Sequence, residues 1–166
     1  MPIIAFESLP DDARAWVFGS DRPLDDNAAA RLLAEVDRFL VQWHAHGHPL
    51  SAARCWQDDR FLTVAVDQRT AGASGCSIDG LYRALRAQEA ALGVQLLGAG
   101  GIFYRDADGV VALASRAEFA ALGARGAVKP DTHVFDLSVE TLGEWRARFE
   151  APAHAGWQAR LLTASR

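Results

Sequence analysis

The residues with the greatest capacity for chemistry in this 166-residue sequence lie in one short stretch, residues 71–79. Cys76 supplies a thiol, Ser74 and Ser77 supply hydroxyls, and Gly75 lets a backbone approach a ligand closely. The stretch is predicted to open a helix near Ser77. The free N–H groups and partial positive charge at a helix N-terminus bind anions and lower the pKa of a thiol. We therefore predict a small-molecule or anion-binding site here, with Cys76 as a candidate nucleophile or redox group.

The same stretch has a simpler structural interpretation. Asp79 lies three residues after Cys76, and its negative charge raises the pKa of a nearby thiol. Free cysteine is also among the most buried residue types. In this interpretation Cys76 fills a small space in the core, the serines cap the helix and the glycines turn the chain. The sequence leaves both interpretations open.

Other side chains are candidate partners of Cys76. His44 and His46 follow a predicted helix, and a Cys–His pair supports nucleophilic catalysis when the fold brings the two side chains together. Asp67 closes a predicted buried strand just before the loop, and Arg54 on the neighbouring strand can pair with Asp67 or contact an anion. We predict that Cys76, His44, His46 and Asp67 form the catalytic group. The predicted ligand-binding residues are Ser74, Gly75, Ser77, Asp79 and Arg54.

The histidines do not make a complete metal site. His44, His46 and His48 alternate along the chain, but a zinc site needs further thiolate, carboxylate or imidazole ligands from elsewhere. Histidines at the C-terminal end of a helix also have a plain electrostatic explanation, because the helix dipole favours positive charge there. We therefore predict neither a metal nor a cofactor.

Composition and missing motifs exclude several function classes. A net charge of −4 and a pI of about 5.7 argue against a protein that tracks the phosphate backbone of nucleic acid. The only lysine, Lys129, has no glycine-rich context, so the chain lacks the P-loop of an ATPase. No stretch approaches the ~20 apolar residues of a membrane span, and the first residues do not resemble a signal peptide. With only two cysteines, we expect a soluble, cytoplasmic protein whose oligomeric state stays unknown.

Hydrophobic periodicity predicts the elements that position these residues. Apolar residues between Ala29 and Trp43 fall on one helical face, and Gly47 is predicted to be the left-handed C-cap of this helix. A second helix runs from Ile78 to Leu92 with Gly93 as its C-cap. The predicted strands span residues 15–18, 51–56, 60–66 and 94–97, and the short polar turn at residues 57–59 predicts a hairpin between the second and the third. This order predicts an α+β domain over residues 1–166, with a ferredoxin-like βαββαβ core. A hairpin over residues 102–114 and a helical C-terminal tail are added to that core, and Ser115 is predicted to cap a short helix that follows the hairpin.

Several motifs together resemble a family of small uncharacterised bacterial proteins that often carry the automatic label "ABC transporter ATPase". The resemblance spans most of the chain, and the Ser-Gly-Cys-Ser-Ile-Asp motif at residues 74–79 is its most specific part. It implies no activity, substrate or catalytic residue, and the label conflicts with the absent P-loop. The motifs are Leu9-Pro10-Asp11-Asp12, Trp43-His44-Ala45-His46-Gly47, Arg60-Phe61-Leu62, Ala73-Ser74-Gly75-Cys76-Ser77-Ile78-Asp79 and Asp131-Thr132.

The sequence therefore supports two kinds of function. The first is binding of a small molecule or anion at residues 74–79, with or without catalysis by Cys76. The second is a non-catalytic protein-interaction or adaptor domain that uses an exposed sheet face or the helical tail. The substrate, the reaction and the existence of catalysis stay open.

Overall fold

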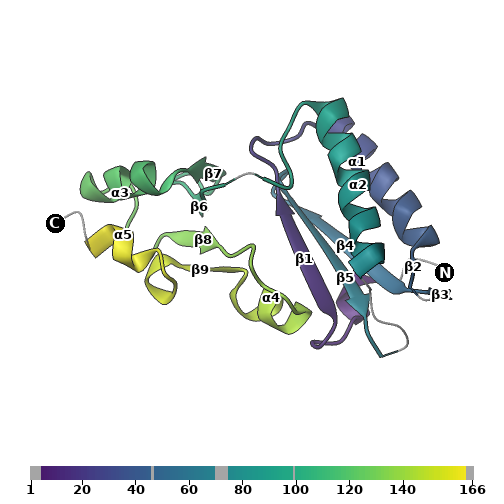
Figure 1. Ribbon diagram of the computed structural model, residues 1–166. Coiled ribbons are helices and arrows are strands. Elements are labelled where there is room, and N and C mark those ends of the chain that lie inside the picture. Colours follow the sequence, from purple (N-terminus) through teal and green to yellow (C-terminus); the bar gives the residue numbers. More distant parts are fainter. Residues whose placement is uncertain (1–4, 46, 70–74, 99, 164–166) are drawn as a thin grey trace. The chain divides into compact units, whose positions relative to one another are not determined.

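The computed structural model describes residues 5–45, 47–69, 75–98 and 100–163 (Figure 1). Over these residues the chain is an α+β protein, with five α-helices and two main antiparallel sheets. No helix in the described part of the chain is both long enough and apolar enough to cross a bilayer. The sequence predicts one domain over residues 1–166. Within it, contacts group the chain into two compact units, which are described separately.

Unit 1 comprises residues 1–99 and 137–146 and contains a three-stranded sheet. Its strands are β1 (Arg14–Gly19), β4 (Ser51–Gln57) and β5 (Phe61–Asp67). β5 lies in the centre, antiparallel to both neighbours, and is buried along its whole length. The predicted hairpin between β4 and β5 is confirmed, because Asp58 and Asp59 both adopt the left-handed conformation that a tight turn requires.

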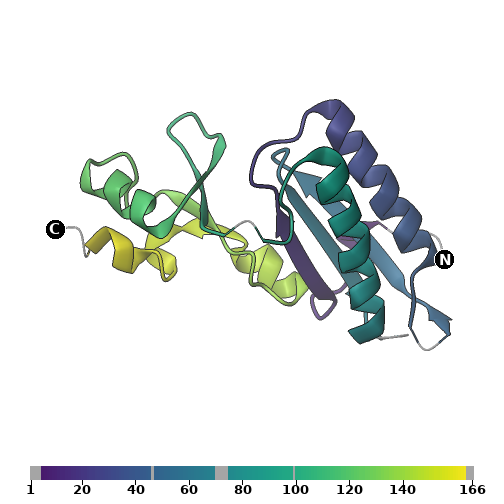
Figure 2. The same ribbon diagram turned by 45° about the horizontal axis from the view of Figure 1, so that its top comes forward.

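Two helices cover one face of this sheet, side by side in both views (Figures 1 and 2). They are α1 (Asp26–Gln42) and α2 (Gly75–Leu92), and both predicted helices are thereby confirmed. Asp25 caps α1 by accepting the N–H of Ala28 at 2.8 Å. The helices pack on alternate, helix-facing residues of the strands, including Phe18, Leu62, Val64 and Val66.

Small side chains occupy the opposite face of the same sheet. Ala15, Ala53 and Ala65 are almost completely buried there. They pack against the 3₁₀ turn η1 (Phe6–Ser8) and against Leu142 at the start of α4 (Leu142–Arg148). The alanines let these elements come close to the sheet, so both faces of the unit 1 sheet contribute to a core.

The end of α1 differs from the prediction. The helix stops at Gln42, and Gly47 therefore does not serve as its C-cap. Gly47 does adopt the expected left-handed conformation, with φ at +78°, but in the turn between two short strands. These strands are β2 (His44–Ala45) and β3 (His48–Pro49), which pair with each other.

The predicted strand over residues 94–97 is wrong, since these residues form no strand. One carboxylate oxygen of Glu89 in α2 accepts the backbone N–H groups of Leu96 and Leu97, at 2.6 and 2.9 Å. Those N–H groups are therefore not available to a neighbouring strand. The backbone of the segment is hydrogen-bonded to the chain just beyond β1, where Asp21 donates its N–H to the carbonyl of Gln95 at 3.0 Å. The ferredoxin-like topology is accordingly not confirmed.

Unit 2 comprises residues 100–136 and 147–166. Its strands are β6 (Ile102–Arg105), β7 (Val111–Ala114), β8 (His133–Phe135) and β9 (Glu150–Pro152), in the order β7-β6-β8-β9. The β6–β7 hairpin is confirmed, and Ser115 caps the following helix α3 (Arg116–Ala124) as predicted. The turn η2 (Ala153–Ala155) and α5 (Ala159–Thr163) complete the unit. Segments predicted as an added hairpin and tail thus contain a second sheet with its own core around Phe119.

Candidate functional site

The predicted Cys76 site lies largely outside the described residues. α2 begins at Gly75, close to the predicted helix start. Ser74 and His46 lie outside the described residues, and so do the side chains of Cys76 and Ser77. Asp79 is exposed on α2. The anion site and the nucleophilic role of Cys76 therefore stay predictions.

Asp67 is already engaged by a neighbour. Its carboxylate receives the side chain of Arg69 at both oxygens, with the shortest contact at 2.7 Å, and the backbone N–H of Arg69 at 2.9 Å. These hydrogen bonds from Arg69 lower the pKa of the Asp67 carboxyl below its usual value. Asp67 is therefore a turn-stabilising carboxylate, and in this arrangement it is a poor proton acceptor for a distant thiol.

Arg54 pairs with Asp37 of α1 rather than with Asp67. The two side chains form a bidentate contact with N···O distances of 2.8 and 2.9 Å, which raises the pKa of the Arg54 guanidinium. His44 lies in β2, exposed, with its Nδ1 next to the carbonyl oxygen of Gln42. Within the described residues, no hydrogen bond or ion pair joins His44, Arg54 and Asp67. The structure does not assemble them into one site.

The described residues offer no alternative metal or thiol centre. No group of three or more His, Cys, Asp or Glu side chains among them is placed to hold a metal ion. Cys55, on β4, is a free cysteine that is half-buried. Burial and the negative charge of Glu7 raise the pKa of its thiol, so Cys55 is a weak nucleophile.

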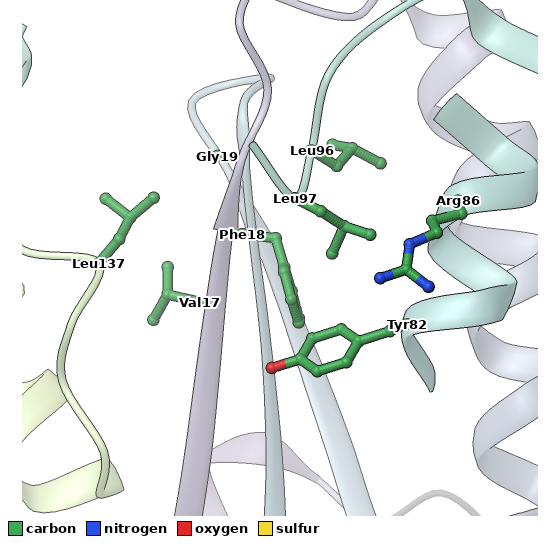
Figure 3. Close-up of a pocket in the computed structure, with 8 residues that line it drawn as sticks. All are labelled: Val17, Phe18, Gly19, Tyr82, Arg86, Leu96, Leu97 and Leu137. Atoms are coloured by element: carbon green, nitrogen blue, oxygen red, sulfur yellow. The ribbon is translucent and has the colours of Figure 1, made fainter. Parts of the chain in front are cut away.

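A pocket of about 410 Å³ lies along the outer edge of β1 (Figure 3). Most of its lining side chains are apolar or aromatic, and all of them belong to unit 1. Val17 and Leu137 approach each other on one side of the strand, whereas Phe18, Tyr82 and Leu97 lie on the other side (Figure 3). The pocket therefore encloses the strand edge from both faces of the sheet. Its lining residues are Val17, Phe18, Gly19, Tyr82, Arg86, Leu96, Leu97 and Leu137.

A second, smaller pocket continues the first along the same strand. It shares Val17, Phe18, Tyr82 and Leu137 with the first pocket and extends to Arg14 and to residues 138–140. The two pockets therefore form one groove beside β1, from Arg14 to Gly19. We call this surface the β1 groove.

The backbone at the bottom of the β1 groove is only partly paired. Just after β1, Ser20 donates its N–H to the carbonyl of Arg60, on the β5 side. Because backbone hydrogen-bonding groups alternate between the two sides of a strand, the N–H and C=O groups of the even-numbered residues of β1 also point toward β5. The backbone N–H and C=O groups of the odd-numbered residues point away from β5, toward the open edge of the sheet. Ala15 donates to the carbonyl of Glu140 at 2.9 Å, and Asp21 donates to Gln95. Between them, Val17 and Gly19 have no backbone partner on the outer side within the part of the chain that the structure describes.

Three charged residues line the β1 groove: Arg14 and Glu140, which pair with each other at 3.1 Å at one end, and Arg86 at the other. Arg86 lies one helical turn after Tyr82 on α2, and its guanidinium points into the pocket beside Leu97 (Figure 3). Arg86 is exposed and has no ion pair or hydrogen bond with any other described residue. The groove thus combines apolar walls, two unpaired backbone positions and one uncompensated positive charge.

The β1 groove was not predicted from the sequence. The spacing of Tyr82 and Arg86 places them on one helical face, and Leu96 and Leu97 follow soon after. That pattern equally fits a helix packed under a further strand, which was the prediction. Comparison of the chain with protein-family models, with curated proteins and with solved structures gives no match.

Proposed function

We propose that unit 1 is a non-catalytic protein-interaction domain that binds an extended peptide segment as an additional strand on β1. One observation carries the proposal: the β1 groove encloses an unpaired strand edge from both faces of the sheet. Side chains of a β-strand point alternately to the two faces. A strand laid along β1 would therefore place one side chain against Val17 and Leu137 and the next against Phe18, Tyr82 and Leu97.

The backbone supports the same occupant. The outward N–H and C=O groups of Val17 and Gly19 match the spacing of a partner strand, because successive outward residues of a strand present successive hydrogen-bonding positions. Unpaired strand edges bind other chains, and domains that recognise peptides by strand addition use main-chain hydrogen bonds for affinity and flanking pockets for specificity. A compact small molecule could contact the walls of the groove, but it would not place alternate groups on the two faces of the sheet as a strand does.

Strand addition would also fill the place of the fourth strand that a ferredoxin-like core has and unit 1 lacks among the described residues. The strand and helix order β1-α1-β4-β5-α2, with β5 between β1 and β4, has the first five elements of the ferredoxin-like core predicted from the sequence. A further strand in that core would lie beside β1. We propose that unit 1 is an incomplete ferredoxin-like core and that the ligand lies in the place of this strand, which residues 96 and 97 do not fill because Glu89 holds them.

Replacing Val17 with proline tests the proposal. Val17→Pro removes an outward N–H that β5 does not use, and proline is tolerated at such edge positions. Peptides selected from a displayed library of random dodecapeptides are the probe, with binding followed by fluorescence polarisation. We expect Val17→Pro to weaken binding by about tenfold or more, since a hydrogen bond is lost and the proline ring obstructs the added strand. Val17→Ala is the matched control, because it trims the side chain and keeps the N–H.

Hydrogen exchange provides a measurement that needs no variant. The amide protons of Val17 and Gly19 should exchange rapidly in the free protein and slowly with the selected peptide bound. Unchanged exchange at both amides in a saturated complex would contradict strand addition. Equal binding by wild type and Val17→Pro would contradict it as well.

A further inference from the structure

We infer that the β1 groove receives the C-terminal end of a partner polypeptide, whose terminal carboxylate binds Arg86. This inference rests on the proposed strand addition and names the class of peptide that fits. Three features of the groove support it: its limited length, its single unpaired charge and the position of that charge along the strand.

The open part of the strand edge is short. At one limit the outward N–H of Asp21 donates to the carbonyl of Gln95, and at the other the N–H of Ala15 donates to the carbonyl of Glu140. The distance between these two limits along β1 is about 20 Å, at roughly 3.3 Å per residue. A continuous chain would have to leave the edge at both limits. A chain that ends in the groove leaves it only once.

The charge of the groove selects the chemistry of that end. The groove's other two charged side chains, Arg14 and Glu140, pair with each other at 3.1 Å, whereas Arg86 has no carboxylate partner among the described residues. The nearby Glu89 is engaged with the N–H groups of Leu96 and Leu97. A guanidinium forms two parallel hydrogen bonds with a carboxylate. A terminal carboxylate belongs to the backbone of the peptide, so it can bind Arg86 while the peptide side chains fill the pockets.

The position of Arg86 sets the direction of the bound chain. Tyr82 belongs to both pockets, whereas Arg86 lines only the one that reaches Gly19, Leu96 and Leu97. The carboxylate therefore lies at the Gly19 end of β1, and the preceding residues extend toward Arg14. The bound peptide therefore runs parallel to β1, in the opposite direction to the fourth ferredoxin-like strand whose place it takes, with apolar residues at alternate positions near its C-terminus.

A pair of peptides and a pair of variants test this inference. The probe is the tightest peptide selected from random decapeptides displayed with free C-termini, synthesised both as the free acid and as the C-terminal amide. We expect the amide to bind about 10- to 100-fold more weakly than the acid, the range expected for loss of a hydrogen-bonded charge contact. Arg86→Gln should weaken binding of the acid by the same factor and leave binding of the amide unchanged.

Arg83→Gln is the matched control. It removes the same charge from the same helix, at an exposed residue that does not line the groove, so it should change the affinity less than twofold. Equal affinity for acid and amide, or equal effects of the two arginine variants, would overturn the inference. Dependence on Arg86 through an internal acidic side chain of the peptide would overturn it too. In each of these cases sensitivity to Val17→Pro would still uphold strand addition, so the two proposals fail separately.

Discussion

Removing the Glu89 carboxylate should destabilise unit 1 and release the segment that flanks the β1 groove. Glu89 accepts the N–H groups of Leu96 and Leu97 at 2.6 and 2.9 Å through a single oxygen. Leu96 is only 3 % exposed and belongs to the main hydrophobic cluster of unit 1. In Glu89→Ala, two backbone donors lose their acceptor, and Leu96 loses the contact that holds it in the core.

The size of the effect follows from these contacts. A hydrogen bond to a charged group contributes about 1.5–3 kcal/mol to stability. The two bonds share one acceptor oxygen and the segment is partly open to water, so we expect a total loss of about 2–3 kcal/mol rather than the full sum. The better helix propensity of alanine offsets a few tenths of a kcal/mol. Glu89→Gln keeps one carbonyl acceptor without the charge, and its loss should be about half as large.

Urea unfolding followed by tryptophan fluorescence measures this loss. Trp16, Trp43, Trp56 and Trp145 belong to unit 1 and only Trp157 to unit 2, so the signal reports mainly on unit 1. A loss of this size lowers the midpoint by roughly 1 M urea or more, given the usual denaturant dependence. Glu35→Ala is the control, because it makes the same substitution on α1, where Glu35 pairs with Arg38 at the surface.

Two results would refute this reasoning. One is a loss for Glu89→Ala no greater than that of Glu35→Ala. The other is continued protection of the Leu96 and Leu97 amides against hydrogen exchange in Glu89→Ala, which would show that another acceptor holds them.

Three further predictions concern other parts of the chain. In unit 2, hydrogen bonds from Arg105 and then from His133 lower the pKa of Glu150 below its usual 4.5. Its contribution to stability is therefore complete above that pH and lost as the pH falls through the lowered value; urea unfolding at several pH values should show this loss in wild type and not in Glu150→Gln. If residues 74–79 form an activated site, iodoacetamide should label Cys76 faster than free cysteine and much faster than Cys55, as followed by mass spectrometry of tryptic peptides. A rate at or below that of free cysteine would exclude the nucleophilic role. Asp25→Ala removes the cap of α1 and should cost about 0.5–2 kcal/mol in the same urea assay, whereas Asp25→Asn should restore most of it.

The sequence by itself determined the elements whose causes are local. The apolar stripe of α1 and its Asp25 cap, the left-handed turn at Asp58 and Asp59, and the Ser115 cap of α3 all depend on residues a few positions apart. The partners in each of these interactions lie close together in the sequence, so periodicity and turn chemistry predict them. The α+β class follows from the order of these elements.

The tertiary structure decided everything that depends on distant partners. Residues 94–97 have a strand pattern, but Glu89 takes the N–H groups that a strand would need, and periodicity carries no record of that side chain. The sequence suggested Asp67 as the partner of Arg54, but the packing of α1 against β4 brings Arg54 to Asp37 instead. The β1 groove unites β1, α2 and Leu137, which lie far apart in the sequence. Its unpaired edge exists because neither flanking segment covers Val17 and Gly19, a property of the folded chain that no single stretch encodes.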